Sequence, residues 1–133
     1  MKNLKCAAML VALGLLHPQI TLADELGRAE YMNTCATCHG ASAAGDGPLA
    51  EFLTVPVPSL TGLSKANDGV FPMLDVIHTV DGRQGTRGHG YPMPVWGDRY
   101  ETELGVEGSL GNEALVRSRI LSIVLYLESI QEE

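Results

Sequence analysis

The 133-residue sequence is poor in cysteine, in aromatic residues and in basic side chains. Three cysteines are too few for the disulfide framework that stabilises many small secreted domains. Nine Lys and Arg stand against 16 Asp and Glu, a formal net charge of −7, which argues against nucleic acid and anionic lipid as partners. The single Trp, four Tyr and two Phe give a core little aromatic volume, so a bound apolar group would fit a domain of this size.

An apolar run long enough to span a bilayer, ~20 residues, is also absent. The run at residues 6–16 follows the basic start MKNLK and precedes Thr21 and Ala23, small residues at the −3 and −1 positions of a cleavage site. This layout predicts a secretory signal peptide over residues 1–23, with an uncleaved membrane anchor as the alternative. The domain is then residues 24–133. Loss of two lysines and no acid changes its net charge from −7 to −9, which favours basic partner surfaces.

The stretch with the most specific chemistry is CATCHG at residues 35–40. Zinc needs four ligands, and no second cysteine or histidine pair stands at zinc-site spacing. A thioredoxin-like thiol site expects alternating strands and helices, a pattern that the sequence lacks. C-x-x-C-H is the attachment pattern of haem c, in which Cys35 and Cys38 form thioethers with the haem vinyl groups and His39 becomes the proximal iron ligand. The sequence therefore predicts one covalently attached haem.

The stretch GYPMPVWGD contains the best candidate for a second axial ligand, Met93, which stands between Pro92 and Pro94. The two prolines fix the backbone on both sides and remove two donors, so they hold an extended loop that projects one side chain. Met93 is the predicted sixth ligand, and His89 is the rival that would give a bis-histidine haem of lower potential. Met73 has helical spacing with other apolar residues and is predicted to lie in the core.

Three local motifs agree with one another along the chain. They are CATCHG at residues 35–40, VPSLTG at 57–62 and MPVWG at 93–97. On these residues the sequence resembles the bacterial monohaem class I cytochromes c. The resemblance implies an all-α fold of about four helices around the haem, and a Pro58 carbonyl that accepts a hydrogen bond from the His39 ring.

The resemblance also extends to the first and last helices. It implies that Gly27 and Tyr31 on the first helix meet Tyr126 on the last, because a glycine lets the two helices cross closely. The acidic segment at residues 97–111 departs from the family pattern.

The sequence pattern predicts helices and no convincing strand. The predicted helices are one that leads into the CATCHG motif, a short one with Pro48 at its first position, one over about residues 70–80 and a last one capped by Asn112. An apolar face is predicted on the last helix, with Leu115, Ile120, Val124 and Leu127 along it.

Two polar side chains flank the Met93 loop. Arg83 is predicted either to be a solvated loop charge or to pair with a haem propionate. Trp96 is predicted either to donate its ring N–H to a propionate or to pack at the haem edge.

Together these features predict a periplasmic carrier of single electrons between a donor dehydrogenase or respiratory complex and an acceptor such as a terminal oxidase. The chain could also be the electron-transfer subunit of a periplasmic oxidoreductase. A five-coordinate gas sensor or small peroxidase is the alternative of another class, but an acid–base constellation beyond His89 is not visible. We expect no enzyme activity, no nucleic-acid binding, no membrane insertion after cleavage, and a monomer or a transient complex with redox proteins.

Overall fold

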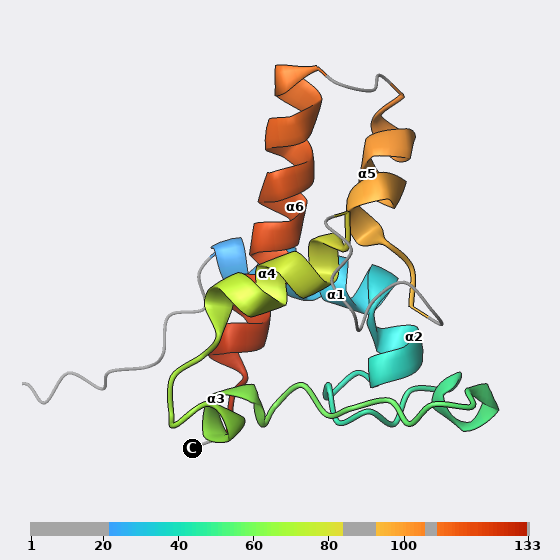
Figure 1. Ribbon diagram of the computed structural model, residues 1–133, viewed down its shortest axis with the longest axis vertical. Coiled ribbons are helices and arrows are strands. Elements are labelled where there is room, and N and C mark those ends of the chain that lie inside the picture. The colour runs from blue at the N-terminus through green and yellow to red at the C-terminus, as the bar shows by residue number, and fades with distance from the viewer. Residues whose placement is uncertain (1–21, 84–92, 106–108, 133) are drawn as a thin grey trace, which may run out of the picture.

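The computed structural model describes residues 22–83, 93–105 and 109–132, and within these ranges the chain is helical without a strand. The elements are α1 (Leu22–Thr34), α2 (Ala36–His39), the 3-10 turn η1 (Ala50–Phe52), α3 (Leu63–Ala66), α4 (Met73–Asp81), α5 (Trp96–Leu104) and α6 (Leu110–Ser129) (Figure 1). The all-α prediction is confirmed, although the described ranges hold more helices than the four predicted. None of these helices has the length and apolarity that a membrane span requires.

Helices α1 and α6 cross at Gly27. A Cβ at this position would clash with the backbone carbonyl of Ser122 and lie 2.9 Å from the Cβ of Tyr126. The fully buried Tyr31 stacks at a tilt on Tyr126, with 5.3 Å between the ring centroids, and its hydroxyl donates to the Gly40 carbonyl at 2.7 Å. The close crossing that the resemblance implied is therefore present.

The buried face of α6 is largely the predicted one. Ile120, Val124 and Leu127 are buried. Leu115 is 51% exposed, so its predicted place on this face is wrong, and Val116 is buried instead. The reason is helical geometry, because a step of four residues back from Ile120 reaches position 116 rather than 115.

Two predicted helix starts differ from the structure. Ser109, not Asn112, caps α6, and its hydroxyl accepts the Asn112 backbone N–H at 3.1 Å. Both residue types cap helices well, and the backbone that enters α6 makes the earlier one the cap. Pro48 does not begin an α-helix, since the chain after it forms only the 3-10 turn η1.

Helix α4 begins three residues later than predicted and ends at Gly82. The left-handed conformation of Gly82 (φ 69°) stops the helix, and its N–H bonds to the His78 carbonyl at 2.9 Å. Met73 packs partly buried against the core, as predicted, whereas Leu74 is exposed. Figure 1 shows α4 crossing α6 in the middle of the molecule.

The acidic segment at residues 97–111 contains most of α5, which was not predicted. Trp96 and Tyr100 are buried and Leu104 packs partly buried against the same core, so the apolar residues of α5 recur every four positions. Helix α5 lies beside the N-terminal half of α6 (Figure 1).

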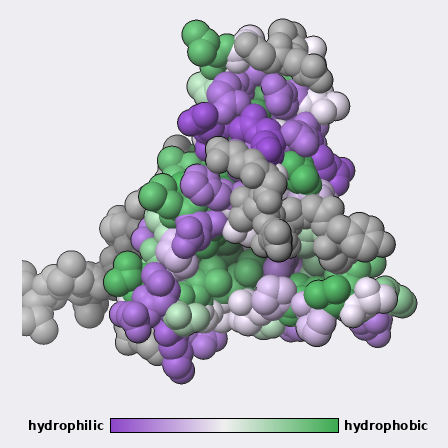
Figure 2. Space-filling view, viewed as in Figure 1, coloured by the Kyte–Doolittle hydropathy of each residue, from purple (hydrophilic) through white to green (hydrophobic). Residues whose placement is uncertain are grey.

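Ion pairs as well as apolar contacts join α5 to α6. Arg119 of α6 pairs with Glu103 of α5 at 2.8 Å and with Glu30 of α1 at 3.0 Å, and it covers the Tyr100 ring 3.8 Å from the centroid. Figure 2 shows hydrophilic residues gathered over this end of the molecule. In this view the surface of the α5–α6 pair is mainly polar.

Replacing Gly27 with Ala tests the helix crossing. We expect Gly27→Ala to lower the free energy of unfolding by about 1–3 kcal/mol, because the added methyl overpacks the contact with Ser122 and Tyr126. Gly111→Ala on α6 is the control, since a Cβ there meets nothing within 4 Å. Thermal unfolding measures both, and a Gly27→Ala protein as stable as the wild type would contradict the packing described.

Candidate functional site

The CATCHG motif lies where α1 passes into α2. The Cys35 N–H donates to the Tyr31 carbonyl at 2.8 Å and the His39 N–H donates to the Cys35 carbonyl at 2.9 Å, so the motif forms one helical turn. Gly40 ends the turn with φ 83°. Because side chains four residues apart share a helix face, Cys35 and His39 point to the same side, and both line one cavity.

His39 is held in a form that can bind a metal through its ring Nε2. Its side chain is buried, and its Nδ1 lies 3.1 Å from the Pro58 carbonyl oxygen. A carbonyl only accepts, so Nδ1 must donate and carries the ring proton. Burial lowers the pKa of His39, and the hydrogen bond to Pro58 opposes this only in part. A neutral imidazole with its lone pair on Nε2 is the form that binds metals.

The loop after α2 brings Pro58 to His39. Gly45 donates its N–H to the His39 carbonyl at 2.8 Å, and Leu60 donates to the Ala43 carbonyl at 2.8 Å. Gly45 has φ 84°, and a Cβ there would clash with the Val57 carbonyl. The structure thus contains the hydrogen bond that the resemblance implied, while the role of Pro58 in orienting an iron ligand stays a prediction.

One cavity brings together most of the predicted site residues. Its walls are Cys35, His39, Leu60, Val76, Val80, Met93, Trp96, Ile123 and Leu127. Met93 and His39 face the same space although 54 residues separate them in the numbering of the chain. The remaining walls are largely apolar, which disfavours water and favours an apolar ligand.

Trp96 carries an unsatisfied donor at this cavity. The residue is 7% exposed, and its ring Nε1 has no hydrogen-bond partner among the residues that the structure describes. A buried polar atom without a partner is rare in native proteins and often marks a site for a ligand group. An acceptor such as a carboxylate would satisfy it, so the prediction that Trp96 donates to a propionate remains consistent with its position.

Cys35 does not have the properties of a reactive redox thiol. Both cysteines are free, and burial raises the pKa of Cys35 to about 11, although a hydrogen bond between its sulfur and the Thr34 hydroxyl opposes the shift. Reactive redox thiols have lowered pKa values. Nor does any group of three His, Cys, Asp or Glu side chains gather as a metal site within the described ranges.

The residues present fit a covalently bound haem c. The two neighbouring thiols, Cys35 and Cys38, can form thioethers. The neutral His39 has its Nδ1 held by a carbonyl, and the thioether of Met93 faces the same cavity. The unpaired N–H of Trp96 adds a donor for a carboxylate. Among the described residues that line the cavity, none carries a charged side chain at neutral pH.

Other predicted site residues lie elsewhere. Arg83 is not a solvated charge, because its side chain is 18% exposed and pairs with Asp81 and Glu113. The pairing of Arg83 with a propionate stays a prediction, and the propionate would compete with these two carboxylates for the guanidinium group. His89 lies outside the described residues.

Sequence reasoning did not identify several cavity walls. Val76 and Val80 of α4, and Ile123 of α6, line the cavity without having been singled out. Their signal was present in the spacing, since Val76 and Val80 are four residues apart, as are Ile123 and Leu127. Periodicity marks a buried face but does not show which partner it faces.

The family model for cytochrome c matches residues 25–107, more than half of the chain. No curated protein and no solved structure matches the chain. The chain belongs to the cytochrome c family, and its helical fold and CxxCH motif are those of a class I monohaem cytochrome c. The family binds haem c covalently through the motif formed here by Cys35, Cys38 and His39, and its members are generally electron carriers rather than enzymes.

The unpaired donor of Trp96 leads to a test on the haem-bound protein. We expect Trp96→Phe to lower the reduction potential by roughly 10–40 mV, because loss of the N–H that would pair with a propionate leaves more negative charge near the iron. For a one-electron couple, about 59 mV corresponds to a tenfold change in the equilibrium constant. Tyr100→Phe is the control, since its ring is 5.8 Å from that of Trp96 but its hydroxyl points to Glu30. Redox titration of both variants gives the comparison, and an unchanged potential in Trp96→Phe means that Trp96 only packs.

Proposed function

We propose that this chain is a periplasmic cytochrome c that carries single electrons, and that His39 and Met93 are the two axial ligands of its haem iron. The observation that supports this ligand pair is that both side chains line one cavity with Cys35. When bound, the haem supplies a one-electron ferric–ferrous couple.

The protein side chains serve to hold one coordination geometry in both redox states. Pro58 orients the His39 ring through the 3.1 Å hydrogen bond, so Nε2 points into the cavity. Met93 contributes a neutral thioether, which favours the reduced state and a high potential. Val76, Val80 and Ile123 line the cavity and exclude water, so little needs to reorganise when an electron is transferred.

An exposed apolar loop beside the motif is the proposed place for electron exchange. Leu49 donates its backbone N–H to the Thr37 carbonyl at 3.0 Å, which fixes this loop beside Cys38. Leu49, Phe52 and Val55 are exposed there. Redox encounter interfaces are small, below ~1,200 Å², and this surface suits one of that kind.

The partners we propose are redox proteins with basic surfaces. The net charge of the predicted mature domain is −9, since the chain total of −7 loses two lysines with residues 1–23. Such a charge steers association with basic surfaces. A donor dehydrogenase and an acceptor oxidase meet this description, as does a periplasmic oxidoreductase of which the chain is the electron-transfer subunit. The signal peptide predicted over residues 1–23 is the reason for the proposed periplasmic location.

The proposed ligand set is tested by absorption spectroscopy of the oxidised haem protein. We expect a weak methionine-to-iron charge-transfer band in the near infrared that is lost in Met93→Ala, because alanine cannot coordinate iron. Met73→Ala is the matched control, since Met73 packs against the core but does not line the cavity. Its band should remain even if the variant loses about 2–5 kcal/mol of stability.

Two results would contradict the proposal. A high-spin spectrum, or ready binding of carbon monoxide by the reduced wild type, would favour the five-coordinate sensor or peroxidase. A low-spin spectrum that Met93→Ala leaves unchanged would favour His89 as the sixth ligand.

A further inference from the structure

The two stretches of chain that flank residues 84–92 meet in space. Gly82 packs on Val95, and a Cβ on Gly82 would lie 3.2 Å from a Val95 side-chain methyl. Gly97 packs on Asp81 and Arg83, and a Cβ there would clash with the side chains of both. The chain therefore leaves the end of α4 and returns to the start of α5 at the same place, with Met93 two residues before Val95.

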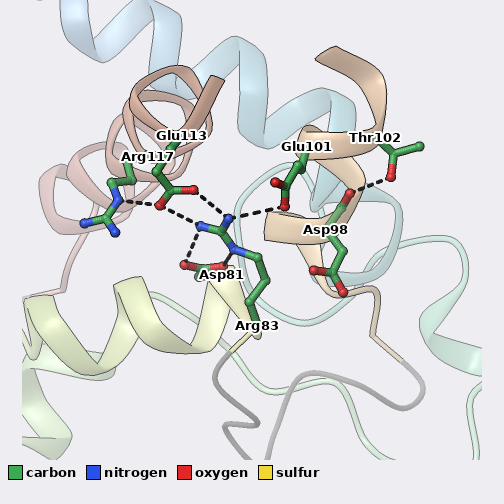
Figure 3. A network of polar contacts seen from close by, with 7 residues as sticks. All are labelled: Asp81, Arg83, Asp98, Glu101, Thr102, Glu113 and Arg117. Carbon is green, nitrogen blue, oxygen red and sulfur yellow. Dashed lines mark hydrogen bonds and ion pairs between the residues drawn. The ribbon is translucent and has the colours of Figure 1, made fainter. Parts of the chain in front are cut away.

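Arg83 lies at this junction, and all three nitrogens of its guanidinium group donate hydrogen bonds. Its Nε and Nη2 donate to the two carboxylate oxygens of Asp81 at 2.5 and 3.1 Å. Its Nη1 and Nη2 donate to the two oxygens of Glu113 at 2.8 and 3.2 Å, and Nη1 lies 3.6 Å from Glu101. Figure 3 shows the guanidinium between these three carboxylates, which come from α4, α5 and α6.

The cluster depends on Arg83 more than on any of its acids. Side-chain exposure is 18% for Arg83 and 15% for Asp81, so water screens this pair only partly. Bidentate arginine–carboxylate pairs are among the strongest ion pairs in proteins. Without Arg83, the three carboxylates would lose the cation that they share, and their mutual repulsion would weaken the packing of α4, α5 and α6 at this point.

The other arginine of the cluster has a different place. Arg117 donates to Glu113 at 2.5 Å, but both residues lie on α6 one turn apart, and Arg117 is 75% exposed. Hydrogen bonds from Arg83, and then from Arg117, lower the pKa of Glu113 to about 2, so this carboxylate is charged at neutral pH. Arg117 therefore contributes charge to the cluster without joining the Met93 side of the chain to α6.

We propose that Arg83 is a positioning residue that keeps Met93 at the haem iron, by fastening the end of α4 to α6 on one side and to the start of α5 on the other. Trp96 and Gly97 follow Met93 within four residues, so a displacement at the Arg83–Gly97 contact is passed directly to the ligand. The inference rests on the proposed His39–Met93 ligation and adds the device that maintains it.

The test is the rate at which imidazole displaces the methionine from the ferric haem protein, followed by stopped-flow absorption. We expect Arg83→Gln to raise this rate about tenfold. The substitution breaks a partly buried ion pair and leaves three like charges, which weakens the attachment of the end of α4 to α6 and to the start of α5. Arg117→Gln is the matched control, since it removes the same charge from the same cluster. Its rate should stay within about twofold of the wild type, as expected for an exposed pair.

Glu113→Gln provides a second variant if Arg83→Gln yields no folded protein. It keeps the pair of Arg83 with Asp81 but weakens the link to α6, so a smaller increase, about two- to fivefold, is expected. Equal rates in Arg83→Gln and Arg117→Gln, or a wild-type rate in Glu113→Gln, would overturn the positioning role. The wild-type spectrum distinguishes failure of the Arg83 positioning role from failure of the His39–Met93 ligation. Absence of the methionine band in the wild type overturns the ligation proposal itself.

Discussion

The close crossing of α1 and α6 at Gly27 is the contact on which the rest of the structure depends. Helix α1 leads directly into Cys35 and His39, and α6 contributes Ile123 and Leu127 to the cavity that these residues line. Because Gly27 has no side chain, the backbone of α6 reaches α1 and its apolar face lies over the motif. The close approach of α6 to α1, about two turns before the motif, therefore places Ile123 and Leu127 at the cavity that Cys35 and His39 line.

Apolar contacts and arginine–carboxylate pairs stabilise different parts of the structure. Apolar side chains of α4 and α6 form the walls of the cavity, which favour a bound planar group and exclude water. Away from the cavity, α5 is fastened by arginines, with Arg119 joining α1, α5 and α6 and Arg83 joining α4, α5 and α6. Charged groups suit this second task because directional pairs fix the position of a helix that has few apolar residues of its own.

The attachment motif and the fold class could be predicted from the sequence because their information is local. Cys35, Cys38 and His39 lie within five residues, and their chemistry admits one good interpretation. Helix α5 was missed because its apolar residues, Trp96, Tyr100 and Leu104, are separated by charged and polar ones in an acidic segment. The partners of Arg83 could not be predicted, since Glu113 lies 30 residues away and only the packing of α5 and α6 brings them together. The choice of Ser109 over Asn112 as the α6 cap likewise depends on how the chain enters the helix.

The proposed ligation holds one haem between His39 and Met93. Proton NMR of the reduced protein, labelled at its methionine methyl groups, tests it most directly, because a methyl on an axial methionine lies over the haem ring and is shifted far upfield by the ring current. We expect one such resonance, which disappears in Met93→Leu. Absence of an upfield methyl resonance in the wild type, or its persistence in Met93→Leu, would contradict ligation by Met93.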